Sequence, residues 1–170
     1  MSWHRTGMIA LGTVCLIACA MSPEEQVLTR FFEASRALDS TQLYRLATVT
    51  LNPRVDGSIQ TFSIADRRAD EKAPLVDSRR EQARRSLTAS GGQDVDLARS
   101  TVEMITRQIT IDASLRTPDG TVRPAVLFVT LEKAVATTAG SVVEGQWIVT
   151  RLQRAPDART SPAASSVPRS

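Results

Sequence analysis

The chain has 170 residues, of which 42% are hydrophobic and 23% are charged, so it can form one folded domain with short additional segments. Aromatic residues make up only 4%, and aliphatic side chains must therefore supply most of the core. The formal net charge is only +3, which argues against a dedicated nucleic-acid-binding protein because such a protein concentrates positive charge on one face.

The first segment has the pattern of a secretory signal peptide. A short polar start with His4 and Arg5 is followed by the uncharged stretch "GMIALGTVCLIACAM". This stretch is too short to span a bilayer, which takes about 20 apolar residues, and it ends in small residues. We therefore expect the segment to direct export rather than to remain as a membrane span.

Leu16-Ile17-Ala18-Cys19 resembles the lipobox of bacterial lipoproteins. In that family the cysteine thiol receives a diacylglycerol, the peptide bond before the cysteine is cleaved, and the new amino terminus is often acylated with a fatty acid such as palmitate. The resemblance implies loss of residues 1–18, lipidation of Cys19, and an anchor and linker over residues 19–23. It implies a lipid-anchored protein of the bacterial cell envelope. Because Ala20 rather than Asp follows the cysteine, the resemblance to enterobacterial lipoproteins also implies sorting to the outer membrane, facing the periplasm.

Other interpretations of the two cysteines stay open. Ala18-Cys19-Ala20 also fits the pattern of ordinary signal cleavage, which would release a chain beginning at Met21. Cys15 and Cys19 have a spacing found among zinc ligands, but no histidine or cysteine follows them to complete a site. Free cysteines can also act as small apolar fillers.

Two helices are predicted next. Ser22 as N-cap, Pro23 at the first position and Glu24 and Glu25 in the first turn mark a helix start. An apolar stripe with helical spacing follows, made of Val27, Leu28, Phe31, Phe32, Ser35 and Leu38. Asp39-Ser40 predicts a break and a new cap. The second, short helix carries Leu43, Tyr44, Leu46 and Ala47.

The middle of the chain is mostly polar. "NPRVDG" predicts a turn, residues 58–65 alternate as a strand does, and residues 66–100 are rich in charge. Within them we predict a surface helix over residues 76–87, supported by ion pairs Asp77–Arg80 and Glu81–Arg85, with Gly91 as its stop. Paired arginines suggest either a solvated helix face or contact with anionic lipid; they are Arg67-Arg68, Arg79-Arg80 and Arg84-Arg85.

The last part predicts three long antiparallel strands. Residues 102–116 alternate, "TPDGT" at 117–121 is a hairpin turn, and strands follow over 122–135 and 142–152. One face of the first two strands is apolar, with Ile105, Ile109, Ile111, Ala113, Leu115, Ala125, Leu127, Val129 and Leu131. Residues 154–170 contain several prolines and small polar residues, which predicts a disordered tail.

Helices first and strands last predict an α+β fold, in which N-terminal helices pack on one face of a curved antiparallel sheet in a single domain over residues 24–153. The order, together with "VLTRFFEASRALDSTQLYRL" and "EGQWIVTRLQ", resembles the nuclear transport factor 2-like (SnoaL-like) cone. That resemblance implies a cone with a pocket between helices and sheet. A cystatin-like fold would show the same order of elements.

The residues available for chemistry are few. The single histidine, His4, lies in the segment expected to be removed, so a histidine-dependent triad or metal site is not expected, and we predict neither a cofactor nor catalysis. Carboxylates on the strands, such as Asp112 and Glu132, alternate away from the apolar face and are expected to be exposed to solvent. An exposed acid keeps an ordinary pKa and is a poor general acid.

Tyr44, Arg107 and Trp147 are the candidate pocket residues. Arg107 falls on the apolar face of its strand, where it could bind an anionic group of a ligand or cover apolar surface with its stem. We expect a non-catalytic binding or scaffold module with a possible protein partner in the envelope. The alternative is a small-molecule-binding or cryptically enzymatic domain with a pocket between helices and sheet.

Overall fold

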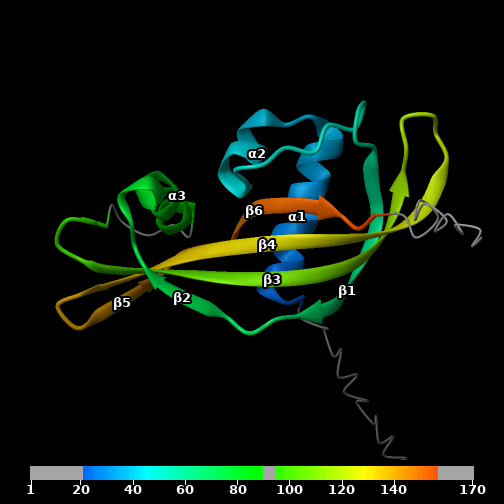
Figure 1. The fold of residues 1–170 in the computed structure, drawn as a ribbon. Coiled ribbons are helices and arrows are strands. Elements are labelled where there is room, and N and C mark those ends of the chain that lie inside the picture. Colours follow the sequence, from blue (N-terminus) through cyan, green and yellow to red (C-terminus); the bar gives the residue numbers. More distant parts are fainter. Residues whose placement is uncertain (1–20, 90–94, 157–170) are drawn as a thin grey trace, which may run out of the picture.

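The computed structural model describes residues 21–89 and 95–156 and shows helices packed on a strongly curved antiparallel sheet (Figure 1). The helices are α1 (Pro23–Ala37), α2 (Ser40–Leu46) and α3 (Arg80–Ala89), the last preceded by the short 3-10 turn η1 (Asp77–Arg79). The strands are β1 (Ser58–Arg67), β2 (Glu71–Pro74), β3 (Thr101–Arg116), β4 (Val122–Thr138), β5 (Ser141–Glu144) and β6 (Ile148–Arg154). The α+β prediction is confirmed at this level.

The long hairpin of β3 and β4 forms the centre of the sheet. Strands β1 and β2 pair in succession along the outer edge of β3, and β5 and β6 pair along the outer edge of β4. The β1–β3 register shifts at Ile59/Thr61 and at Ile64/Asp66, and β4–β6 shifts at Thr130/Leu131. Such bulges bend a strand and increase its twist, which accounts for the curvature in Figure 1.

Helix α1 begins as its sequence predicts. The Ser22 hydroxyl accepts a hydrogen bond from the Glu25 amide at 3.3 Å, and the Glu25 carboxylate accepts one from the Ser22 amide at 2.9 Å, which completes a capping box. The prediction that the apolar stripe of this helix extends to Leu38 was wrong. Leu38 is not part of the apolar stripe, because it ends the helix in the left-handed region at φ 55° and is 54% exposed.

The main core lies between α1 and one face of the sheet. Phe31 and Phe32 are 0% and 2% exposed, and the Phe32 ring meets Phe62 of β1 edge to face with centroids 5.3 Å apart. Every apolar strand position predicted for this face is buried in the same cluster. These side chains fill the space between α1 and the sheet.

Helix α3 covers the opposite face of the sheet near the other end of the β3–β4 hairpin. Its Ala83 and Leu87 form a second cluster with Val102 and Met104 of β3 and with Ala134 and Ala136 of β4. Along β3, odd-numbered positions face the main core and these even-numbered ones face α3, as the twofold period of a strand requires. The sheet is therefore covered on both faces, at different ends.

The position of α3 corrects the prediction for Glu132. Asp112 is exposed as expected, but Glu132 is only 7% exposed because α3 lies over its face of β4. Its carboxylate accepts a hydrogen bond from the Gln82 amide and lies 3.7 Å from the Arg79 guanidinium. The ion pairs predicted within the helix are present, with Arg80 Nε 2.8 Å from Asp77 and Arg85 Nε 3.3 Å from Glu81.

The strand predicted over residues 142–152 is interrupted, which gives β5 and β6 instead of one strand. At the break, the amide of Ala134 in β4 donates to the Ser86 hydroxyl at 2.9 Å, and Gln146 donates its amide to the Ser86 carbonyl oxygen at 2.8 Å. Gly145 lies so close to Ser86 that a Cβ there would be 2.8 Å from the Ser86 carbonyl carbon. Ser86 of α3 thus accepts hydrogen bonds from the backbone at the edge of β4 and from the connection between β5 and β6.

Some boundaries differ from the sequence prediction. The short strand β2 was not predicted, and Arg154, predicted to begin the tail, is the last residue of β6. The predicted helix stop at Gly91, the tail over residues 157–170, and Ala18 and Cys19 of the lipobox lie outside the described residues.

Candidate functional site

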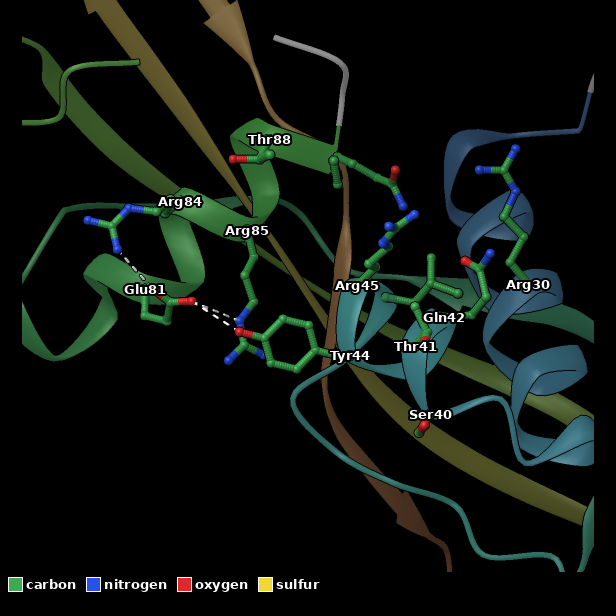
Figure 2. Close-up of a pocket in the computed structure, with 13 residues that line it drawn as sticks. Arg30, Ser40, Thr41, Gln42, Tyr44, Arg45, Glu81, Arg84, Arg85 and Thr88 are labelled. Atoms are coloured by element: carbon green, nitrogen blue, oxygen red, sulfur yellow. Dashed lines mark hydrogen bonds and ion pairs between the residues drawn. The ribbon is translucent and has the colours of Figure 1, made fainter. Parts of the chain in front are cut away.

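A cleft lies where α2 faces α3 (Figure 2). It has a volume of about 970 Å³, within the range of small-molecule sites. Helix α1 contributes Arg30, and Gln146, just before β6, adds an amide. The lining is Arg30, Ser40, Thr41, Gln42, Tyr44, Arg45, Leu46, Glu81, Arg84, Arg85, Thr88, Ala89 and Gln146.

The backbone holds α2 in place against the sheet. The Asp39 carboxylate caps α2 by accepting a hydrogen bond from the Gln42 amide at 2.9 Å. At its other end the chain forms an isolated parallel bridge between Ala47 and Val149 of β6, and Thr48 donates its amide to the Val149 carbonyl at 2.9 Å. The α2 side of the cleft is therefore fixed to the same sheet that carries α3.

A cluster of three side chains joins the two sides of the cleft. The guanidinium of Arg85 lies 3.8 Å from the centre of the Tyr44 ring, a cation–π contact. The Tyr44 hydroxyl donates to Glu81 at 3.4 Å, and Figure 2 shows Glu81, Arg85 and Tyr44 meeting between α3 and α2. The hydrogen bond from Arg85, with a further contribution from Arg84, lowers the pKa of the Glu81 carboxyl below its ordinary value.

The cleft carries an excess of positive charge. Among residues 21–89 and 95–156, its lining has four arginines and one carboxylate, that of Glu81. Arg84 and Arg85 both pair with this carboxylate, at 2.9 and 3.3 Å. Within residues 21–89 and 95–156, by contrast, no carboxylate lies within ion-pair distance of Arg30 or Arg45. Two exposed guanidinium groups of the cleft therefore retain their hydrogen-bonding capacity.

We expect the Glu81 titration to report the cluster. Replacing Arg85 by Gln should raise the pKa of Glu81 back toward 4.5, because the largest cause of its lowering is removed. Because the folded pKa is depressed, the contribution of this group to stability is present above the unfolded pKa and is lost as pH falls through the folded value. Carboxyl ¹³C NMR titration measures the shift. Arg99→Gln, outside the cleft, should leave it unchanged.

The predicted pocket residues divide between two places. Tyr44 lines the cleft, whereas Arg107 and Trp147 lie together on the main-core side of the sheet, with the guanidinium 4.9 Å from the Trp147 ring centre. Arg107 bonds Asp70 through two nitrogens at 2.6 and 2.7 Å and also pairs with the buried Glu24. Its anionic partners are thus the protein's own carboxylates. Trp147 is 5% exposed and packs in the core.

Arg30 and Arg45 were not predicted as site residues. The pair Arg84-Arg85 stands out in the sequence because its arginines are adjacent, and the structure places that pair in the cleft. Arg30 and Arg45 are isolated charges on the outer sides of two helices. Only the approach of α2 to α3 brings them beside the pair, and no local spacing encodes that approach.

Within the part of the chain that the structure describes, no group of three or more His, Cys, Asp or Glu side chains could hold a metal ion. None of the helices among those residues is long and apolar enough to cross a membrane. Comparisons with protein-family models, with curated proteins and with solved structures find no match.

Proposed function

We propose that this chain is a lipid-anchored protein of the bacterial cell envelope that acts as a binding module, with the cleft between α2 and α3 as its binding site. The observation that carries the binding role is the open cleft of about 970 Å³ with two unpaired guanidinium groups among its described residues. A buried core would exclude such groups or pair them, and a flat surface would give a ligand little contact area.

The anchor part of the proposal is supported by the lipobox Leu16-Ile17-Ala18-Cys19 and by the short distance from it to the domain. The fold begins at the Ser22 cap, three residues after the cysteine, so the lipid would hold the domain directly at the membrane surface. One acyl chain binds a membrane only marginally, whereas two or three hold stably at about 0.8 kcal/mol per buried methylene. Ala20 favours the outer membrane as the destination.

The arrangement also supports membership in the nuclear transport factor 2-like class as a finer proposal for the fold. Helices lead the chain, and the segment after α2 joins the last strand by a parallel bridge. A pocket between α1 and the sheet, as in the alternative function, is less well supported, because Leu28, Phe31 and their neighbours fill that space. We therefore place the binding site at the cleft.

The anchor is tested by the intact mass of the protein recovered from a bacterial membrane fraction. The wild-type chain should begin at Cys19 and carry acyl chains, and globomycin, which blocks the lipoprotein peptidase, should arrest its processing. Cys19→Ala should abolish acylation. Cys15→Ala is the matched control and should change nothing, because that residue lies in the discarded segment. An unmodified chain beginning at Met21 would refute the anchor.

A further inference from the structure

We propose that the cleft binds a soluble oxyanion with two or more phosphate or carboxylate groups, approaching from the side of the domain opposite the lipid anchor; this rests on the binding site and anchor of the proposed function. The ligand class follows from the chemistry of the lining. The direction follows from the position of the cleft along α1.

The charged groups select an oxyanion. Guanidinium groups donate paired hydrogen bonds that match carboxylate and phosphate oxygens, and Arg30 and Arg45 have no carboxylate partner among the described residues. In Figure 2 their side chains come from α1 and α2 and extend toward the same end of the cleft. Two separate cations are best satisfied by a ligand with more than one negative group.

A third cation of the cleft, the Arg85 guanidinium, is held in position by its neighbours. Arg85 is held between the Tyr44 ring and the Glu81 carboxylate, and its side chain is 23% exposed, so it is oriented without being fully enclosed. Arg84 bonds the other oxygen of Glu81 and in Figure 2 points away from α2. Glu81 is the only carboxylate among the described lining residues, and it is occupied by these two arginines, which limits its repulsion of an anion.

The remaining lining residues favour a ligand whose uncharged part is polar over a ligand with a lipid tail. The hydroxyls of Ser40, Thr41 and Thr88 and the amides of Gln42 and Gln146 can donate to and accept from hydroxyl groups. In the described part of the lining, the apolar aliphatic side chains are Leu46, which is 3% exposed, and Ala89. The cleft is therefore suited to a phosphorylated or carboxylated polar compound.

The position of the cleft separates it from the membrane that would hold the anchor. Residues 19–23 span at most about 18 Å when extended, and the 15-residue helix α1 extends about 22 Å from its start. Helix α2 follows the far end of α1, and Figure 1 shows the start of α1 at the lower edge of the sheet in this view, with α2 and α3 above the strands. A lipid headgroup of the membrane that holds the proposed anchor would therefore approach the domain from the side where α1 starts, away from the cleft.

The test is isothermal titration calorimetry of the full chain in nonionic detergent with pyrophosphate, citrate and sucrose. Pyrophosphate or citrate should bind, more weakly as salt is added, and the stronger of the two identifies the anionic group. Arg30→Gln/Arg45→Gln should weaken that binding by at least about tenfold. The control Arg54→Gln/Arg116→Gln removes the same charge at exposed positions outside the cleft and should stay within about twofold.

Several results would overturn the inference. An equal loss of binding affinity in both double variants would mean that the net charge of the protein, and not the cleft, attracts the anion. Binding of sucrose that requires Tyr44 but neither Arg30 nor Arg45 would leave a binding module with a different ligand class. Binding only to phosphatidylglycerol vesicles would refute the soluble ligand, and no heat with any probe would refute the binding site.

An unlipidated chain that still binds pyrophosphate at the cleft would refute the anchor alone. Unfolding midpoints of both double variants, expected to equal that of the wild type, exclude misfolding.

Discussion

Replacing Arg107 by Ala should lower the free energy of unfolding by about 3–5 kcal/mol. The guanidinium is paired with Glu24, whose side chain is only 6% exposed, and with Asp70 through two hydrogen bonds. Its removal leaves the Glu24 carboxylate buried without a cation, and it also removes the contact with the Trp147 ring. Equilibrium urea unfolding measures the change.

Arg99→Ala is the matched control for this variant. Arg99 forms an ion pair with Asp96 at 3.4 Å, but the two side chains are 86% and 55% exposed. Exposed pairs contribute little, so the loss should stay below about 1 kcal/mol. A loss of that same small size for Arg107→Ala would show that the stability of the fold does not depend on the pairing of Glu24 with its arginine.

Gly145→Ala should destabilise the protein by about 1–3 kcal/mol and should act mainly on α3. A Cβ at this position would lie 2.8 Å from the Ser86 carbonyl carbon and 2.9 Å from the Ser86 carbonyl oxygen, and neither backbone atom can rotate away. The helix must move off the edge of β4, which weakens the hydrogen bond from the Ala134 amide to the Ser86 hydroxyl. Hydrogen exchange should show faster exchange at the amides of Ala83 and Leu87 than in the wild type.

Gly140→Ala separates this clash from the general cost of a glycine substitution. Gly140 has φ +88°, so a side chain there is strained by about 1 kcal/mol, but a Cβ at this position would have no atom of the described residues within 4 Å beyond its chain neighbours. The Gly140→Ala variant should therefore show faster hydrogen exchange only around the turn, and hydrogen exchange of the α3 amides should be unchanged. Equal exchange of α3 in both variants would contradict the close packing of α3 at Gly145.

The sequence was informative where local signals agree with tertiary packing. The start of α1 was predictable because Ser22, Pro23 and Glu25 form a self-contained cap, and the faces of β3 and β4 were predictable because one face is continuously aliphatic. The hairpin turn over residues 117–121 was predictable from its own hydrogen bonds, including that of the Thr121 amide to Asp119 at 3.0 Å. Each of these features is specified by residues adjacent in the chain.

Several features that were not predicted depend on α3. Its docking buries Glu132, which the alternation of β4 alone would leave in water, and it splits the last predicted strand through contacts of Ser86 with Ala134, Gly145 and Gln146. The same docking assembles the cleft from three helices. Such contacts join residues that are far apart in the sequence, and a charged helix with two arginine pairs gives no local sign of them.

The ion pairs of Arg107 have a mechanical consequence. Glu24 lies in the first turn of α1, directly after the segment that leads to the proposed anchor, and Arg107 lies in the middle of β3, a central strand of the sheet. A tensile force applied to the chain before Ser22 therefore reaches β3 through this ion pair as well as passing along the backbone of α1. The helix end is loaded together with the sheet, so the domain would resist being peeled open from its tethered end.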